Sequence, residues 1–275
     1  MDSNGQFRLD GKVAVITGGS KGIGSGCARV FVQAGAQVVI CAREKSAGYA
    51  FAEELNIIRD GSAIYVPCDV SVERDIQQVI GTAVEKYGRL DCLLNNAGYH
   101  PGFKGIDEFS TDDFRRIIET NLVSYFVACK SALPHLRKTR GTIINMGSLV
   151  GVFGQEGSCI YAATKGAIAS FTKSLAIEES RFGVRVNCVS PGNILSESRA
   201  RGVAASPDGE AMNKLVDSWQ CFGYSGKNED VGNLCLFLAS EASAYITGAD
   251  IIISGGSELG YGIKYPLPFF SGKAI

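Results

Sequence analysis

Short apolar runs rich in β-branched residues alternate with longer helical patterns along the whole chain. Most residues of these runs are apolar without alternation, which is typical of parallel strands that helices cover on both faces. The succession of strands and helices predicts an α/β fold with one doubly wound parallel sheet. Seven runs are predicted strands: residues 13–17, 37–41, 63–67, 92–95, 141–146, 185–190 and 250–254. The main predicted helices cover residues 22–33, 44–59, 72–87, 111–136 and 161–181.

The 275 residues are predicted to form a single domain over 1–275, because no linker rich in Pro, Gly or Ser divides them. Two segments depart from the alternation. Residues 195–226 form a long connection after the sixth strand, which is typical of a lid over a ligand crevice. The C-terminal tail, 263–275, is apolar without a helical period. It is expected either to pack on the surface or to form a subunit contact.

The charged residues are balanced, with 27 Lys and Arg against 28 Asp and Glu, and the formal net charge is −1. Nucleic-acid binding is therefore not expected, because it needs a basic surface. The sequence has neither an apolar run of about 18 residues nor a signal sequence, so we expect a cytoplasmic protein without a membrane span. Nine cysteines without a C-x-x-C pair indicate reduced thiols. With only two histidines, no metal site is expected.

A glycine-rich turn, TGGSKGIG at residues 17–24, follows the first predicted strand and leads directly into a helix. Glycines let the backbone turn sharply and approach a pyrophosphate, and a helix N-terminus attracts its negative charge. The spacing is neither G-x-G-x-x-G nor G-x-x-x-x-G-K-[ST], and a purely structural turn is the alternative. We expect a dinucleotide site that includes Gly18, Ser20, Lys21, Gly22, Ile23 and Gly24.

The end of the second predicted strand bears on the choice between NAD and NADP. An NAD-binding chain places Asp or Glu there, to accept hydrogen bonds from the adenosine ribose. Here Ala42 has that position, Arg43 follows it, and Lys21 lies in the glycine turn. Two cations without a carboxylate fit a ribose 2′-phosphate, which favours NADP(H). In the alternative, Arg43 is solvated and Glu44 replaces the missing acid, which makes NAD(H) possible.

Tyr161 and Lys165 are spaced i, i+4 at the start of a predicted helix, so they lie on one face, one turn apart. A nearby ammonium favours a phenolate, so Lys165 is expected to lower the pKa of Tyr161 and fit it for proton transfer. Ser148 follows the fifth predicted strand, at the edge of the sheet where ligands bind. Its hydroxyl is expected to hold the substrate oxygen. The alternative is that the Tyr/Lys pair belongs to an ordinary helix surface.

These motifs, with the segments CDV (68–70), NNAG (95–98) and PGNI (191–194), resemble those of the short-chain dehydrogenase/reductase family. The resemblance extends from about residue 9 to about residue 262 and implies a Rossmann-like fold and a catalytic tetrad. In that tetrad Tyr161 would be the acid/base, Ser148 would hold the substrate oxygen, and Lys165 would bind the cofactor ribose. Asn121 would hold a water that continues the proton relay. Beyond the glycine turn and Arg43, the implied cofactor-binding residues are Asp69, Val70, Asn95, Asn96, Ala97, Gly98, Tyr161, Lys165, Pro191, Gly192, Ile194 and Ser196.

Four strings, LDCLLNNAGYHP, GSLVGVFGQ, SPGNI and GGSELGYG, resemble a subgroup of this family that oxidises secondary alcohols. The resemblance implies a homotetramer, with a hydroxysteroid or a small sugar such as fucose as candidate substrate. Two features depart from the pattern: Ala42 stands where the subgroup has Asp, and Gly223-Tyr224 replaces a frequent Gly-Arg element. The implied substrate-pocket residues are Ser148, His100, Gln155, Asn193 and Tyr261.

The sequence therefore predicts an oxidoreductase that transfers a hydride between a nicotinamide cofactor and a small-molecule secondary alcohol or ketone. One alternative is an NADPH-dependent carbonyl reductase of another small ketone. A second is a catalytically silent regulator that binds a dinucleotide, against which the complete tetrad argues. The sequence offers no G-x-S-x-G nucleophile elbow for competing chemistry.

Overall fold

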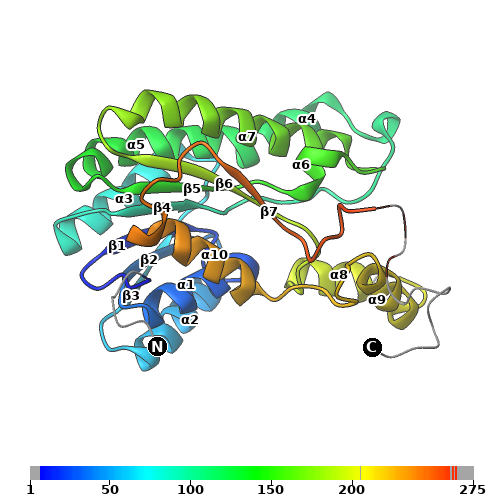
Figure 1. Ribbon diagram of the computed structural model, residues 1–275, viewed down its shortest axis with the longest axis horizontal. Helices are drawn as coiled ribbons and strands as arrows, with labels where there is room; N and C mark the ends of the chain where they lie inside the picture. The colour runs from blue at the N-terminus through cyan, green and yellow to red at the C-terminus, as the bar shows by residue number, and fades with distance from the viewer. Residues whose placement is uncertain (1–6, 205, 261, 263, 265–275) are drawn as a thin grey trace.

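The computed structural model describes residues 7–204, 206–260, 262 and 264. Within them, seven parallel strands form one sheet in the order β3-β2-β1-β4-β5-β6-β7, so the strand order reverses between β1 and β4 (Figure 1). The predicted doubly wound sheet is confirmed, and each predicted strand boundary lies within one residue of the observed one. The strands are β1 (Val13–Thr17), β2 (Gln37–Ala42), β3 (Ala63–Pro67), β4 (Cys92–Asn95), β5 (Thr142–Met146), β6 (Arg185–Pro191) and β7 (Asp250–Ile253).

Helices cover both faces of the sheet (Figure 1). One face packs against α1 (Gly22–Gln33), α2 (Lys45–Ile58) and α10 (Asn228–Ala239). The other packs against α3 (Glu73–Tyr87), α5 (Ser124–Thr139) and α7 (Cys159–Ser180). The remaining α-helices are α4 (Thr111–Ile118), α6 (Leu149–Phe153), α8 (Glu197–Ala204) and α9 (Gly209–Ser218).

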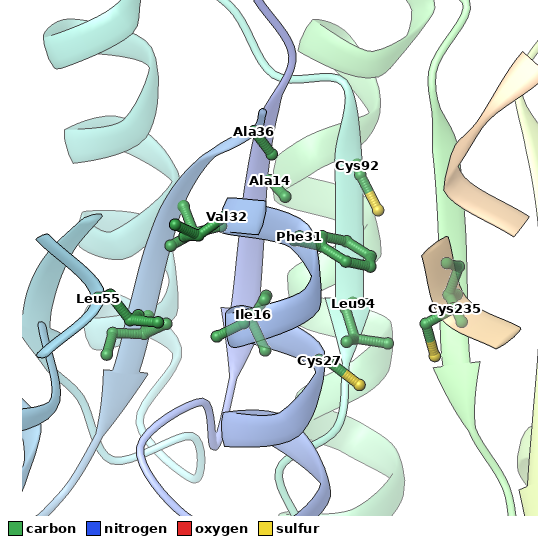
Figure 2. Close-up of a cluster of buried hydrophobic side chains, with 14 of the residues drawn as sticks. Ala14, Ile16, Cys27, Phe31, Val32, Ala36, Leu55, Cys92, Leu94 and Cys235 are labelled. Atoms are coloured by element: carbon green, nitrogen blue, oxygen red, sulfur yellow. The ribbon is translucent and has the colours of Figure 1, made fainter. Parts of the chain in front are cut away.

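Alternate residues of β1 belong to two separate hydrophobic cores. Ala14 and Ile16 pack with Phe31 of α1 and Leu94 of β4, as Figure 2 shows, whereas Val15 faces the core on the opposite side of the sheet. All five residues of β1 are buried. This burial on both faces explains why the strands appear in the sequence as continuous apolar runs.

The predicted helix at 111–136 is interrupted in the structure. The chain passes from α4 through a π-helical turn, Glu119–Val123, and then continues as α5 to Thr139. A π turn inserts an extra residue and rotates the side chains that follow it. It carries Asn121, which is fully buried. Periodicity alone did not reveal this turn, because the buried residues Ile117, Asn121 and Tyr125 keep a helix-like spacing of four positions across it.

Helices α1 and α10 cross at glycines. A methyl group built at Gly26 would lie 2.5 Å from the backbone carbonyl carbon of Asn228, and one built at Gly232 would lie 2.9 Å from the carbonyl oxygen of Gly26. The backbones therefore approach more closely than any side chain allows. Next to this contact, α1 packs on the sheet with its N-terminus at the carboxyl end of β1.

We expect Gly26→Ala to destabilise the protein by about 1–3 kcal/mol, because the neighbouring backbone of α10 cannot yield to the added methyl group. The measurement is urea unfolding followed by circular dichroism. Gly81→Ala is the matched control, because Gly81 lies in α3 with nothing within 4 Å of its built methyl group. That substitution should stabilise the protein by about 0.5–1 kcal/mol through helix propensity. Equal effects of the two substitutions would contradict the close crossing.

Candidate active site

A cavity of about 1210 Å³ opens at the carboxyl edge of the sheet, beside the reversal between β1 and β4. Ligands of doubly wound sheets bind at this place. Most of the predicted site residues line it. They are Gly18, Ser20, Lys21, Gly22, Ile23, Arg43, Asp69, Val70, Asn96, Ala97, Gly98, His100, Ser148, Tyr161, Lys165, Pro191, Gly192 and Ser196.

The glycine turn is held against the end of β4. Asn96 Nδ2 donates to the carbonyl oxygens of Thr17 and Gly18, at 3.0 and 3.1 Å. Gly18 has φ +63°, and a methyl group built on it would lie 3.0 Å from Ala97 Cα. A methyl group on Gly24 would collide with the Gly18 carbonyl. Gly24 does not line the cavity. Its lack of a side chain lets the first turn of α1 pack directly against the glycine turn.

The N-terminus of α1 fits a phosphate. Its N-cap residue, Lys21, makes no side-chain capping hydrogen bond, so this end of the helix keeps open N–H groups and the positive end of its dipole. The small residues of the turn leave room for a pyrophosphate next to them. The residues present therefore fit a dinucleotide cofactor.

Opposite charges meet beyond the ends of β2 and β3. Lys21 Nζ is hydrogen-bonded to a Glu44 carboxylate oxygen, and both side chains are about half exposed. Asp69 accepts hydrogen bonds from the backbone and hydroxyl of Ser71, which lower its pKa, and the charge of Arg43 lowers it further. The Lys21–Glu44 pair was not predicted, because it joins a turn and a helix cap that are 23 residues apart.

Tyr161, Ser148 and Lys165 meet at the far end of the cavity. Burial raises the pKa of Tyr161, and a hydrogen bond with Ser148 lowers it. The lowering of this pKa by the charge of Lys165, which the sequence predicts, stays a prediction. Its Nζ donates to the carbonyl oxygen of Met146 at 2.7 Å and lies 5.7 Å from the centre of the Tyr161 ring. Burial lowers the pKa of Lys165 itself to about 8.

Asn121 is buried behind the cavity and does not line it. Its side chain accepts from the backbone N–H of Tyr99 and donates to the Tyr99 carbonyl, both at 3.0 Å. It thus fixes the backbone that follows the NNAG segment. Its predicted role in holding a relay water stays a prediction.

His100 lines the cavity with its ring fixed at both nitrogens. Nδ1 accepts from the backbone N–H of Gly102 at 3.1 Å, so Nε2 carries the proton and donates to Ser158 Oγ at 3.0 Å. The ring centre lies 4.7 Å from that of Tyr161. Ser158 is the N-cap of α7, but its side chain makes no capping bond and is used by His100 instead.

The other predicted residues lie away from the cavity lining. Asn95 and Ile194 are buried, and Asn95 donates to Asn145 on β5 at 2.9 Å. Gln155 is exposed, and the amide of Asn193 donates to Gln220 at 2.9 Å. Tyr261 lies outside the described residues. Their substrate or cofactor contacts stay predictions.

The 195–226 segment is organised by Arg199. Its guanidinium donates to Asp217 and Asn213, at 3.1 Å each, and to the hydroxyl of Ser225. These bonds tie α8, α9 and the loop after α9 together. Gly223-Tyr224, which stands where the family often has Gly-Arg, lies in the loop after α9. The Tyr224 ring is exposed there and stacks on Phe222.

Three residues that organise the site were not predicted from the sequence. Thr17 Oγ1 accepts from the backbone N–H groups of Asn96 and Ala97. Tyr125 lies buried beneath Lys165, and Ser158 holds His100. Only Tyr125 had a local signal, since it follows Asn121 by four positions in a helical pattern.

The described residues contain neither a membrane-spanning helix nor a metal-binding cluster. No helix among them is long and apolar enough to cross a membrane. In the same part of the chain, no group of three or more His, Cys, Asp or Glu side chains is arranged to hold a metal ion.

Comparison with known proteins gives consistent matches over nearly the whole chain. Residues 18–258 match the family model described as Enoyl-(Acyl carrier protein) reductase. The chain is 44% identical over 257 residues to the L-fucose dehydrogenase of Bos taurus, covering 94% of this chain and 93% of the relative. It is 46% identical over 257 residues to that of Rattus norvegicus, with the same coverage. A short-chain type dehydrogenase/reductase from Mycobacterium marinum superposes with a TM-score of 0.84 at 32% identity, covering 93% and 98% of the two chains.

Burial lowers the pKa of His100, so NMR titration should place its midpoint below 6.5 and show, above that midpoint, a neutral ring with its proton on Nε2. Because the native protein binds this proton less readily than the unfolded chain, stability should fall as the pH drops below about 6.5. The chain has two histidines, and His100→Gln assigns the signal.

Ser158→Ala should disturb the tautomer, whereas Ser170→Ala, on an exposed face of α7, should not. A proton found on Nδ1 in the wild type would contradict the assignment.

Proposed function

The chain belongs to the short-chain dehydrogenase/reductase family, and we propose that its substrate is L-fucose or a sugar of similar shape. Members of this family transfer a hydride between a nicotinamide cofactor and an alcohol or ketone, and this chain is such an oxidoreductase. The observation that carries the sugar proposal is the 44–46% identity to L-fucose dehydrogenases over more than nine-tenths of the chain. The cavity supports it, since hydroxyl groups of Ser148 and Tyr161 lie at one end.

The mechanism that we propose uses three side chains at that end. When bound, the cofactor supplies the acceptor for the hydride that leaves the alcohol carbon. Ser148 holds the alcohol oxygen, and Tyr161 removes its proton as the carbonyl forms. Lys165 contributes a positive charge behind Tyr161, which favours the phenolate needed to begin the reaction.

We propose that Asn121 fixes this end of the site from behind, through its two bonds with Tyr99. The 195–226 segment would close over the substrate, with Pro191, Gly192, Ile194 and Ser196 next to the nicotinamide. The Arg199 bonds support a closure in which α8 and α9 move together, because they link both helices.

Two features support NADP(H) as the cofactor. Ala42 offers no carboxylate at the end of β2, and Arg43 lines the cavity next to it. Glu44 opposes this choice, because it neutralises Lys21. An exposed ion pair contributes little free energy, so a phosphate dianion can displace the carboxylate from Lys21. Arg43 then remains as the main reader of the 2′-phosphate.

We further propose a homotetramer in the cytosol. Phe114 of α4 and Phe126 of α5 are exposed and offer apolar surface for subunit contacts. All nine cysteines are free thiols, and such thiols persist in a reducing compartment.

Side-by-side fluorescence titrations with NADPH and NADH test the cofactor proposal. NADPH should bind more tightly, and Arg43→Ala should weaken NADPH binding by about tenfold or more while leaving NADH binding nearly unchanged, because one charge-assisted bond is lost. Glu44→Gln should strengthen NADPH binding by freeing Lys21. Arg29→Ala is the control, since Arg29 pairs with Glu54 and does not line the cavity. Tighter NADH binding by the wild type would overturn the proposal.

Turnover of L-fucose, followed by the absorbance of the reduced cofactor, tests the substrate and the mechanism. Tyr161→Phe should lower kcat by about 10²- to 10⁴-fold, because the proton acceptor is lost, while cofactor binding stays intact. Tyr49→Phe is the matched control, because Tyr49 is exposed on α2 and does not line the cavity.

The same assay separates the alternatives. A higher kcat/KM for a hydroxysteroid, or for reduction of a small ketone with NADPH, would replace the sugar as substrate. Unchanged turnover in Tyr161→Phe would remove Tyr161 from the mechanism. A wild type that binds cofactor but converts none of these compounds would be a silent dinucleotide-binding regulator.

A further inference from the structure

A second tyrosine lies beneath the ammonium group of Lys165. Tyr125 is in the first turn of α5 and is 1% exposed. Lys165 Nζ lies 5.5 Å from the centre of its ring and 5.7 Å from the centre of the Tyr161 ring. Both separations are within the range of cation–π attraction, so the ammonium contacts two aromatic rings.

Tyr125 and Lys165 also share one hydrogen-bond acceptor. The carbonyl oxygen of Met146, at the end of β5, accepts from Lys165 Nζ at 2.7 Å and from the Tyr125 hydroxyl at 3.3 Å. A carbonyl oxygen has two lone pairs and can accept both. The ammonium is therefore fixed between the strand end and the Tyr125 ring.

In the described part of the chain, no negatively charged side chain lies next to Lys165 to neutralise its ammonium group. Its ionisable neighbours are Tyr161 on α7, Tyr125 on α5 and Cys188 on β6. No carboxylate of the described residues pairs with it. Burial raises the pKa of Tyr125 well above its usual value, and burial also raises that of Cys188 to about 12, so both stay protonated at neutral pH.

The surroundings of Tyr125 itself are apolar. Tyr125 packs in a small hydrophobic cluster with Ile168 of α7 and Cys188, separate from the two main cores of the sheet. A buried ammonium without a carboxylate partner is costly unless other groups stabilise it. Here those groups are one carbonyl and two aromatic rings, one of which belongs to Tyr161 itself.

We infer that Tyr125 is a positioning residue, whose ring keeps Lys165 charged and directed along the cavity wall behind Tyr161. The ring acts through Lys165 and contacts neither substrate nor cofactor. The inference rests on the proposed function only for its effect on turnover, because the effect on Lys165 exists in the cofactor-free protein. The π turn contributes to it, since it sets the rotation of α5 from which Tyr125 points at Lys165.

The first test measures the charge of Lys165 directly. Side-chain NMR of lysine-labelled protein gives its pKa, with Lys165→Met to assign the signal. Tyr125→Phe keeps the ring and should leave the pKa near the wild-type value of about 8. Tyr125→Met fills most of the space without an aromatic face, and should lower the pKa by roughly one unit.

Ile168→Ala is the matched control. Ile168 is fully buried in the same cluster, so this substitution loosens the packing without touching the ammonium. It should lower the unfolding temperature and leave the Lys165 pKa unchanged. An unchanged pKa in Tyr125→Met, or an equal shift in Ile168→Ala, would overturn the inference.

The second test is the pH profile of turnover. If a charged Lys165 is needed, activity falls at alkaline pH as Lys165 loses its proton. Tyr125→Met should move this fall about one unit toward lower pH, whereas Tyr125→Phe should not. Absent turnover in the wild type would contradict the proposed function but leave the NMR result valid. A shifted pKa with an unshifted profile would overturn the link between Tyr125 and catalysis.

Discussion

Four hydrogen bonds join the ends of β1 and β4 where the strand order reverses, and the rest of the site depends on them. Thr17 Oγ1 accepts from two backbone N–H groups of the NNAG segment, and Asn96 Nδ2 donates to two carbonyl oxygens of the glycine turn. Two chain segments that would otherwise diverge are thereby held at one separation. The N-terminus of α1, the cavity floor and the backbone at Tyr99 are all positioned from this junction.

The strands and the main site residues could be predicted because their signals are local. A buried parallel strand is a continuous apolar run, and the glycine turn and the Tyr161/Lys165 pair each fit within one helical turn or loop. What could not be predicted are contacts between distant segments. Tyr125 reaches Lys165 across 40 positions, and no spacing rule connects them. The raised pKa of Tyr161 was missed for the same reason, since burial depends on all the elements that surround the ring.

The Lys21–Glu44 pair shows why cationic residues in a motif do not by themselves identify a phosphate site. A lysine in the glycine turn counts as a free positive charge in the sequence, yet in the fold its charge is neutralised by a carboxylate from the next helix. Arg43, one position earlier than Glu44, keeps its place on the cavity wall. Arg43 and Glu44 are adjacent at the start of α2, yet the charge of Arg43 would favour binding of a phosphate there and the charge of Glu44 would oppose it.

The two occupied nitrogens of His100 have a consequence for how the site distinguishes ligands. With Gly102 and Ser158 bound to its edge, the ring has no spare donor or acceptor, and it lies between the rings of Tyr161 and Phe103. A substrate bound against this wall would meet aromatic surface rather than hydrogen-bonding groups. The hydroxyl groups of the proposed sugar would then need their partners on the opposite side.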